Sequence, residues 1–493
     1  MPRHRPEVVF PPLRLDRRGG LSIPSQVYLA LRRGILDGRI PAGARLPASR
    51  ELAGALGVAR QGVVAAYERL VAEGFVESRV GSGTRVATGI AVPPAAARTA
   101  ARARPRLSAA ARRVGRLPLQ LSPWRGPLRP LRTGTPALDV APLTLWGRLL
   151  RSACLRARPS ALDYGDALGL PELRRAIAER LYRARAIACS AEQVVITTSA
   201  QQGLDLVARL LVQPGDRVWF EEPGYSGAHG AWTAAGARLV AVPVDGEGIA
   251  VAVGARRAPR ARLAYVTPSH QFPTGVTMGL DRRLALLDWA RRAGAFVVED
   301  DYDSEFVYEG RPLAALFGLA QDSRVVYVGT FSKALFPALR LGFLVLPAEL
   351  VEPCRALRHF ADGFPPTLIQ QAAARLLAEG HFDRHLRRAI RVCRERRDAL
   401  IAAVRRLLLP GYEIASPQAG LHAVLWLPPG MDDHGAAQTA AEAGVETIAV
   451  SAFARRRLAR GGLVLGFAAF APREIERAVE RLAPALAELA AGG

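Results

Sequence analysis

Apolar positions recur every three to four residues in the first part of the chain, which predicts amphipathic helices. The first helix begins near Pro24 and ends before Gly38, and its inward face is formed by Val27, Leu31 and Ile35. A second helix is predicted over residues 49–56, with Ser49 as its N-cap. A third is predicted over residues 60–73, with four apolar side chains facing inward: Val63, Tyr67, Leu70 and Val71.

After the third helix, the pattern changes to short runs that are typical of strands. Residues 75–80 and 84–87 flank the turn Gly81-Ser82-Gly83, which predicts a strand, a glycine turn and a second strand. Three helices followed by such a hairpin make a helix-turn-helix with a wing. We therefore assign residues 20–88 to an α+β winged helix-turn-helix domain.

The remainder of the chain divides into a linker and a large α/β domain. Residues 89–130 are rich in Ala, Pro and Arg and have no lasting apolar period, which indicates a linker. Within residues 131–493, apolar strands alternate with helices, which predicts a largely parallel, buried sheet of the doubly wound kind. The expected strands are 193–197, 216–220, 238–242, 262–267, 295–299, 324–328 and 341–345. From about residue 351 the pattern is mostly helical, with late strands near 421–427 and 463–467, which predicts a smaller C-terminal α+β subdomain.

The composition is globular, because 50% of the 493 residues are hydrophobic and 23% are charged. No apolar run approaches the roughly 18 residues that a membrane span needs, and residues 1–15 do not resemble a secretory signal. We therefore expect a cytoplasmic protein with no membrane partner. The four cysteines lie far apart without a C-x-x-C pair, which favours reduced thiols and no metal cluster.

Positive charge is concentrated at the N-terminus. Residues 1–90 contain 14 arginines and 7 acids, and residues 91–135 contain 10 arginines and no acid, so these parts hold +17 of the net charge of +23. This distribution favours a polyanionic partner for the N-terminal domain, most simply nucleic acid. A solvated basic surface in an arginine-rich chain is the alternative.

Lysine occurs only once, at Lys333, among 67 basic residues. Arginine has replaced lysine wherever a permanent cation is sufficient, so this lysine is expected to do something that arginine cannot do. A lysine amine deprotonates and forms a Schiff base with a carbonyl, whereas a guanidinium stays protonated. Chance placement of a single lysine is the alternative, and its neighbourhood must decide between the two.

That neighbourhood combines an anion site with carboxylates at a strand end. Lys333 follows a predicted strand, where open α/β sheets bind their ligands. Thr330, Ser332 and Arg340 in the same loop suit an anion such as a phosphate. Asp300 and Tyr302 follow another predicted strand. A lysine amine, a carboxylate and a phosphate site together are what a pyridine aldehyde cofactor requires.

These residues and their order resemble a fold-type I aminotransferase. The resemblance is carried by five segments in order: Thr198-Ser199-Ala200-Gln201-Gln202-Gly203, Glu222-Pro223-Gly224-Tyr225, Pro268-Ser269-His270-Gln271-Phe272-Pro273-Thr274-Gly275, Asp300-Asp301-Tyr302 and Ser332-Lys333 to Arg340. The N-terminal domain resembles a GntR-type winged helix in two segments, Arg45-Leu46-Pro47-Ala48-Ser49-Arg50-Glu51-Leu52 and Gly81-Ser82-Gly83-Thr84. Together they resemble the MocR family of regulators that depend on pyridoxal 5'-phosphate (PLP).

The resemblance implies a role for each residue of the large domain. Lys333 would hold PLP through a Schiff base, Asp300 would pair with the pyridine nitrogen and Tyr302 would reach the phenolic oxygen. Tyr225 would stack on the ring. The phosphate would be bound by Ala200, Gln201, Thr330, Ser332 and Arg340. His270 is a weaker candidate for cofactor binding, and Phe272 stands where aminotransferases usually carry an Asn that contacts the cofactor.

In the winged helix, the resemblance implies contacts to double-stranded operator DNA. Arg45, Ser49, Arg50 and Arg60 would contact phosphates or base edges, and the wing Gly81, Ser82, Gly83 and Thr84 would enter the adjacent groove. Relatives usually have Ser-Arg-x-Thr-Val where this chain has Ala59-Arg60-Gln61-Gly62-Val63. Base recognition is therefore expected to depend on Arg60 and Gln61, and the start of the recognition helix lacks a hydroxyl cap.

The favoured function is a homodimeric, PLP-dependent transcriptional regulator that senses PLP or a small amine through its aminotransferase-like domain. An active aminotransferase with an accessory DNA-binding domain is the alternative, and a large domain that only dimerises is a third. Val464 stands where an aminotransferase usually has the arginine that binds a substrate carboxylate, which disfavours turnover. Arg455, Arg456, Arg457 and Arg460 are possible substitutes for that arginine.

Overall fold

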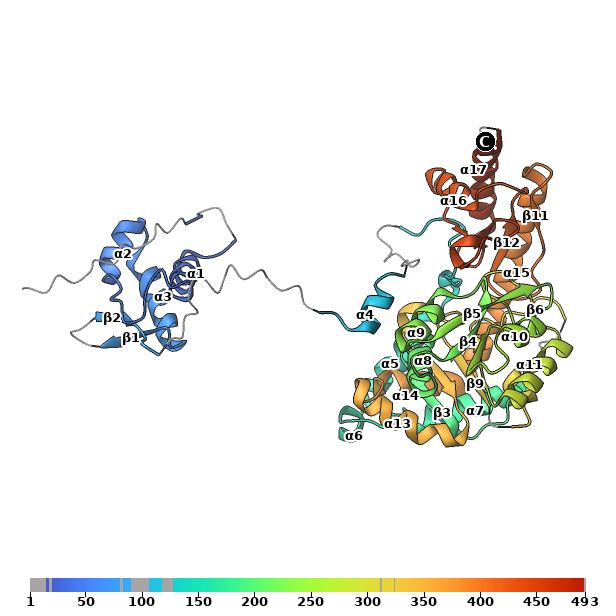
Figure 1. Cartoon of the computed structure of the whole chain (residues 1–493), viewed down its shortest axis with the longest axis horizontal. Coiled ribbons are helices and arrows are strands. Elements are labelled where there is room, and N and C mark those ends of the chain that lie inside the picture. The colour runs from blue at the N-terminus through green and yellow to red at the C-terminus, as the bar shows by residue number, and fades with distance from the viewer. Residues whose placement is uncertain are drawn as a thin grey trace, which may run out of the picture. The chain divides into compact units, whose positions relative to one another are not determined.

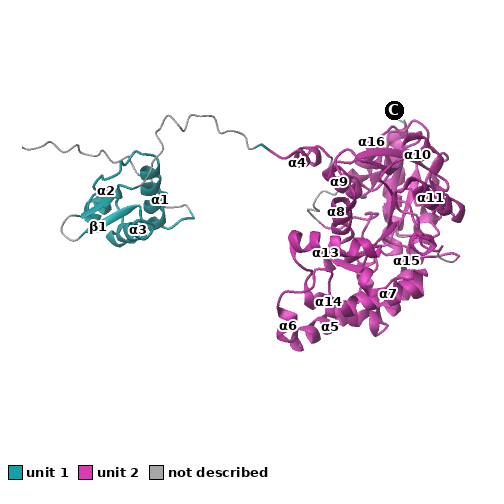
Figure 2. Cartoon of the chain, turned by 60° about the horizontal axis from the view of Figure 1, so that its bottom comes forward, with its two compact units in different colours: residues 1–106 teal, residues 107–493 magenta. Residues whose placement is uncertain are grey.

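The computed structural model describes residues 15–16, 20–79, 83–89, 106–117, 127–310, 313–322 and 324–491. The chain divides into two compact units, residues 1–106 and 107–493 (Figure 2). No helix in these ranges is both long and apolar enough to cross a membrane.

The smaller unit is a winged helix, as the sequence predicted. Its elements are α1 (Ile23–Leu36), α2 (Ser49–Leu56), α3 (Arg60–Ala72), β1 (Val76–Arg79) and β2 (Gly83–Val86). The strands are antiparallel, and Val76 lies opposite Val86. Both valines pack with the inner faces of α1 and α3 in one core. The turn residues Gly81 and Ser82, predicted to form the wing tip, lie outside the described residues.

Two details of the predicted helices are wrong. Ser49 is the first residue of α2, and the N-cap is Ala48. The Glu51 carboxylate accepts the Ala48 N–H at 3.0 Å, which stabilises the start of the helix at that residue. Val71 is 42% exposed, because it follows the buried Leu70 by one position and so points about 100° away from it around the helix.

A short helix, α4 (Ala109–Val114), lies within the range that the sequence analysis assigned to the linker. The Ser108 side chain caps it by accepting the Ala111 N–H at 3.1 Å. Arg113 donates to the carbonyl oxygens of Thr233 and Ala234 at 3.1 and 3.2 Å. These carbonyls end helix α9 (Ser226–Ala235), so α4 is attached to the larger unit.

The larger unit is built on an eight-stranded mixed sheet (Figure 1). In spatial order the strands are β3 (Val194–Thr197), β10 (Gly342–Val345), β9 (Val325–Thr330), β8 (Phe296–Asp301), β7 (Leu263–Val266), β4 (Arg217–Glu222), β5 (Arg238–Asp245) and β6 (Gly248–Ile249). Neighbouring strands from β9 to β5 are parallel, as predicted. The edge strand β6 is antiparallel to β5, and β10 is antiparallel to both β9 and β3, because it follows β9 without a crossover helix.

Helices cover both faces of this sheet. One face packs against α8 (Ala200–Leu211), α9 and α13 (Ala348–Asp362), and the opposite face against α10 (Val251–Arg257), α11 (Leu280–Ala293) and α12 (Leu316–Leu319). Successive residues of β4 show the alternation, because Val218 and Phe220 enter the first core and Trp219 the second. Four further helices complete this part: α5 (Leu143–Leu155), α6 (Pro159–Leu162), α7 (Pro171–Arg185) and α14 (Thr367–Ala378).

The C-terminal part is the predicted smaller α+β subdomain. Its antiparallel sheet has the order β11 (Glu413–Ile414), β12 (His422–Trp426), β14 (Gly462–Gly466) and β13 (Ile448–Ala449). The accompanying helices are α15 (His381–Leu407), α16 (Asp433–Glu442) and α17 (Pro472–Ala491). Short 3₁₀ helices occur at Leu138–Val140, Ala191–Gln193, Pro337–Leu339 and Val450–Phe453.

The missing hydroxyl cap of α3 gives a prediction about stability. The cap position is Ala59, which has no side-chain hydrogen bond to the helix. Ala59→Ser should stabilise the smaller unit by about 0.5 to 2 kcal/mol, since a serine oxygen would accept an unpaired N–H of the first turn. Calorimetry of the full chain should show this as a higher unfolding temperature for that unit. Ala59→Val, which cannot cap, is the control, and an equal gain in both variants would contradict the explanation.

Candidate functional site

The predicted cofactor residues lie around one cavity of about 310 Å³ in the larger unit. Its walls come from the ends of β8 and β9, the first turn of α8 and the residue before α9. Every residue predicted for the cofactor except His270 lines it: Ala200, Gln201, Tyr225, Asp300, Tyr302, Thr330, Ser332, Lys333 and Arg340.

Lys333 follows β9 and lies half-buried at the cavity wall. Its Nζ donates to the Gly134 carbonyl oxygen at 2.6 Å. Burial lowers the pKa of Lys333, although the carboxylates of Asp303 and Asp300 act in the opposite direction. A lower pKa increases the fraction of free amine, which is the form that attacks a carbonyl carbon.

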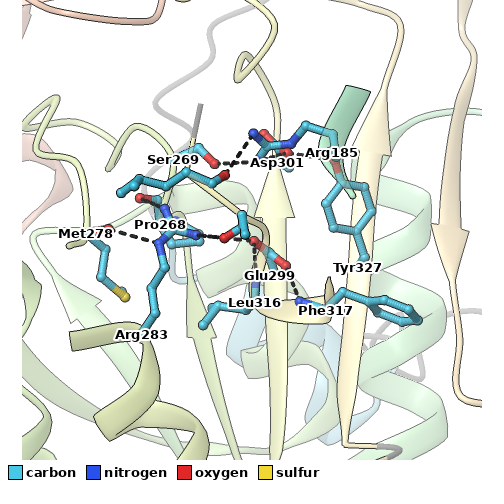
Figure 3. Close-up of polar contacts among 12 residues, drawn as sticks. Arg185, Pro268, Ser269, Met278, Arg283, Glu299, Asp301, Leu316, Phe317 and Tyr327 are labelled. Atoms are coloured by element: carbon cyan, nitrogen blue, oxygen red, sulfur yellow. Dashed lines mark hydrogen bonds and ion pairs between the residues drawn. The ribbon is translucent and has the colours of Figure 1, made fainter. Parts of the chain in front are cut away.

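Three consecutive carboxylates are buried at the end of β8, and two of them are paired with arginine. Figure 3 shows Asp301 with Arg185, whose charged atoms are 3.0 Å apart, and Glu299 near Arg283 at 3.8 Å. Glu299 also accepts the backbone N–H groups of Leu316 and Phe317 at 3.0 and 2.9 Å, and Asp301 accepts the Tyr327 hydroxyl at 2.6 Å. These contacts compensate the burial of both charges.

Asp300 alternates with these two residues along the strand and faces the cavity. Its Oδ2 accepts the Tyr265 hydroxyl at 2.7 Å, but its Oδ1 has no hydrogen-bond partner and no arginine or lysine forms an ion pair with it among the described residues. Burial raises the pKa of Asp300 to about 7. Lys333 acts in the opposite direction but forms no ion pair with Asp300, and a protonated pyridine nitrogen would supply a positive charge in direct contact.

The opposite end of the site suits a phosphate. The first N–H groups of α8 have no partner within the helix, and those of Ala200 and Gln201 lie at the cavity. Arg340 donates to the Ser199 hydroxyl at 3.3 Å, so its guanidinium lies beside this helix start. Thr330 accepts the Ser332 N–H at 3.1 Å, which fixes the second side of the cradle.

Aromatic side chains form the remaining wall. Tyr225 precedes α9, and its hydroxyl lies 3.5 Å from the Gln201 side-chain oxygen. Burial raises the pKa of Tyr225 to about 12, so its phenol is neutral. Phe272 meets Tyr225 and Tyr302 edge to face, with ring centroids 5.9 and 6.2 Å apart. The apolar ring of Phe272 thus lies at the position where the resemblance to aminotransferases predicts an asparagine.

His270 lies behind this wall and not at the cavity. Its Nδ1 is 3.0 Å from the Asp303 carboxylate, and its backbone oxygen accepts the Tyr302 hydroxyl at 2.9 Å. The cavity is also lined by residues to which the sequence analysis gave no role, among them Gly134, Ser199, Tyr265, Asp303 and His422. Ser199 carried a signal, as a hydroxyl residue directly before a helix, whereas Gly134 and His422 come from distant parts of the chain.

In the smaller unit, the predicted DNA contacts are exposed at the starts of α2 and α3. Arg45, Arg50, Arg60 and Gln61 are exposed, and none of these arginines pairs with a described acid. The Ser49 hydroxyl accepts from Arg60 at 3.3 Å, which joins the two helix starts. Arg45 packs against Gly83, where an added Cβ would lie 3.0 Å from its guanidinium, and Thr84 is also in β2.

Comparison with known proteins agrees with both units. The family model "Aminotransferase class I and II" matches residues 137–482, and "Bacterial regulatory proteins, gntR family" matches residues 24–86. The chain is 37% identical to the probable rhizopine catabolism regulatory protein MocR of Rhizobium meliloti, covering 97% of each chain. It is 32% identical to the pyridoxine biosynthesis transcriptional regulator PdxR of Corynebacterium glutamicum, over 92% of this chain and 94% of that one.

Solved structures extend the comparison for the larger unit. The α-aminoadipate aminotransferase LysN of Thermus thermophilus superposes with a TM-score of 0.69 at 32% identity, covering 74% of this chain and 94% of that one. The two units define a transcriptional regulator with a GntR-type winged helix and a fold-type I aminotransferase domain. The chain belongs to the MocR family.

The unpaired state of Asp300 predicts a pH-dependent gain from its removal. The folded-state pKa of about 7 lies above the ordinary value of 3.8, so ionisation costs stability as pH rises towards 7. Asp300→Asn avoids this cost and keeps an acceptor for Tyr265. In the cofactor-free protein, its advantage in unfolding free energy should grow by about 2 kcal/mol between pH 5.5 and 8. Thermal unfolding at both pH values measures it, and a pH-independent difference would contradict the assignment.

Proposed function

We propose that the larger unit binds PLP at Lys333 and that PLP, or a small amine that reaches it, is the signal that this DNA-binding transcriptional regulator senses. One observation carries the proposal: the only lysine of the chain lines the same cavity as Asp300, a buried carboxylate that forms no ion pair among the described residues. A phosphate cradle lies at the same site. This set of groups fits PLP.

Each residue has a task towards the cofactor. PLP supplies an aldehyde carbon and an electron-withdrawing pyridine ring. Lys333 provides the amine, Asp300 holds a proton on the ring nitrogen, and Tyr302 binds the phenolic oxygen. Tyr225 covers one face of the ring and excludes water. The start of α8, together with Thr330, Ser332 and Arg340, binds the phosphate through N–H, hydroxyl and guanidinium donors.

The larger unit has exposed apolar side chains that support a homodimer. Leu155, Leu162 and Tyr164 are 75%, 68% and 90% exposed in and after α5 and α6, and Phe360 of α13 is 85% exposed. Large apolar side chains with this degree of exposure are typical of positions that a second chain covers. Two winged helices in one dimer would bind two half-sites of an operator.

Aminotransferase activity is the alternative function, and the fold is shared with active aminotransferases. The cavity keeps the lysine that such chemistry requires. Arg340, which lies at the phosphate cradle, is the only arginine among the described residues that line it, so the usual partner of a substrate carboxylate is missing. We therefore favour sensing of a ligand over aminotransferase activity as the function of the larger unit. Assay of the PLP-loaded protein with amino acids and 2-oxo acids tests for residual transamination.

Lys333→Arg tests cofactor attachment. Borohydride treatment of the PLP-loaded protein should fix the cofactor to one peptide, the one that contains residue 333. Lys333→Arg keeps the positive charge but cannot form the bond, so labelling and the absorbance of the bound cofactor should disappear. Peptide mass spectrometry and absorbance measure both effects. Unchanged labelling in this variant would show that the attachment site is wrong.

Arg60→Ala tests the DNA contact. If Arg60 reads a guanine through two hydrogen bonds, its loss should cost roughly 1 to 3 kcal/mol of discrimination between operator and unrelated duplex. Binding should also weaken with salt, with a log–log slope of about −0.9 for each neutralised phosphate. Changing linker arginines such as Arg106 should weaken all sequences alike. Arg33→Ala, on the exposed side of α1, is the control, and equal discrimination by all these variants would refute the role of Arg60.

A further inference from the structure

A polar cluster lies in the cavity wall and is not explained by the tasks assigned to the cofactor residues. Asp303 and His422 line the cavity, and His270 lies directly behind them. All three are buried, and one nitrogen or oxygen atom from each lies within 4.8 Å of the others. Only glycine at position 420 permits this packing, since a Cβ there would lie 2.1 Å from the His270 ring.

The hydrogen bonds of His270 and Asp303 assign their protons. Nδ1 of His270 is 3.0 Å from Asp303 Oδ2 and 3.1 Å from the Tyr302 hydroxyl oxygen. Nδ1 therefore carries a hydrogen, which the Asp303 carboxylate accepts. Neither His270 Nε2 nor Asp303 Oδ1 has a partner among the described residues.

His422 adds a second acceptor to Asp303 Oδ1. Its Nε2 lies 3.0 Å from the Pro273 carbonyl oxygen, which only accepts, so Nε2 carries the hydrogen and Nδ1 has a free lone pair. Burial lowers the pKa of His422 well below its ordinary value, so the ring is neutral. The cluster therefore offers two acceptors, Asp303 Oδ1 and His422 Nδ1, and Asp303 Oδ1 is buried without a donor among the described residues. Buried acceptors without donors are costly, and a ligand that donates hydrogen bonds would relieve this cost.

The surroundings disfavour a carboxylate at this place. Val464 packs with Val424, Val450 and Phe453 in a small apolar cluster, and Phe272 packs against it. Two of the possible substitute arginines are held elsewhere, because Arg455 donates to the Leu239 carbonyl and Arg460 to the Leu427 carbonyl. Arg456 and Arg457 are exposed and do not line the cavity. A carboxylate would meet acceptors and apolar side chains but none of these four arginines.

We propose that Asp303, His270 and His422 recognise the far end of a small effector amine that carries a second ammonium or a hydroxyl group and no carboxylate. This inference rests on the proposed function, because the first amine of the effector is bound beside the cofactor at Lys333. Asp303 Oδ1 accepts from the ligand while His270 holds its Oδ2, and His422 Nδ1 accepts a second hydrogen. His270 thus acts as a positioning residue for Asp303.

Four probes of equal chain length test the proposal on the full-length, PLP-loaded protein. Butane-1,4-diamine, 4-aminobutan-1-ol, butylamine and 4-aminobutanoate share a primary amine and differ only at the far end. Titrations that follow the absorbance of the bound cofactor should rank the diamine and the amino alcohol at least about tenfold tighter than butylamine, which is the effect of one hydrogen bond to a charged group. The carboxylate should bind most weakly.

Equal binding of all four probes, or tightest binding of 4-aminobutanoate, would overturn the proposal. A protein that shows no cofactor absorbance after loading would instead contradict the proposed function, so the two failures are distinguishable. A stoichiometric divalent metal ion, measured by elemental analysis and lost on His422→Phe, would also overturn the proposal, since the acceptors would then serve the metal.

Variants assign the effect to the cluster. Asp303→Asn and His422→Phe should reduce the preference for the diamine over butylamine to within about twofold, with cofactor absorbance and unfolding temperature recorded to show that each is folded. His422→Arg should reverse the ranking towards 4-aminobutanoate, because it adds the missing cation. Asp288→Asn, a matched change on the exposed side of α11, should keep the original ranking. A ranking that persists in folded Asp303→Asn and His422→Phe proteins would contradict the assignment.

Discussion

The burial of three consecutive carboxylates at the end of β8 is the constraint on which the larger unit depends. A buried carboxylate without a partner costs several kcal/mol, and neighbouring like charges increase the cost. Arg185 and Arg283 compensate Asp301 and Glu299 from the face opposite the cavity, where they are locked by carbonyl and hydroxyl contacts. Asp300 forms no ion pair among the described residues, so the fold leaves a buried carboxylate that a protonated pyridine ring would pair with.

Much of this arrangement could be predicted from local patterns. The apolar periods of 3.6 and 2 residues identified the helices of the winged helix and most strands of the large sheet, since these elements bury one face or both. The single lysine and the motifs around it indicated one cavity because parallel strands end at the same edge of the sheet. The predictions for Ser49 and Val71 were wrong for local reasons. The N-cap of α2 depends on the Glu51 side chain, and Val71 is rotated away from the buried face by one position, and the apolar pattern does not resolve either detail.

The parts that could not be predicted depend on contacts between distant segments. His422 reaches the cavity from the C-terminal subdomain, and Gly134 from the segment before α5. The antiparallel direction of β10 follows from a short connection whose path the residue pattern does not reveal. The attachment of α4 depends on a single arginine, Arg113, among many in an Arg-rich segment. Helix α9 therefore follows Tyr225 of the cavity at its start and contacts α4 at its end.

The proposed function requires that occupation of the cavity changes the affinity for DNA. The most direct measurement follows cofactor absorbance and operator binding in the same sample while PLP is added to the cofactor-free, full-length protein. The account predicts that operator affinity changes as PLP binds, that both signals reach half of their change at the same PLP concentration, and that Lys333→Arg loses both. Operator affinity that stays constant while the cavity fills with PLP would contradict it.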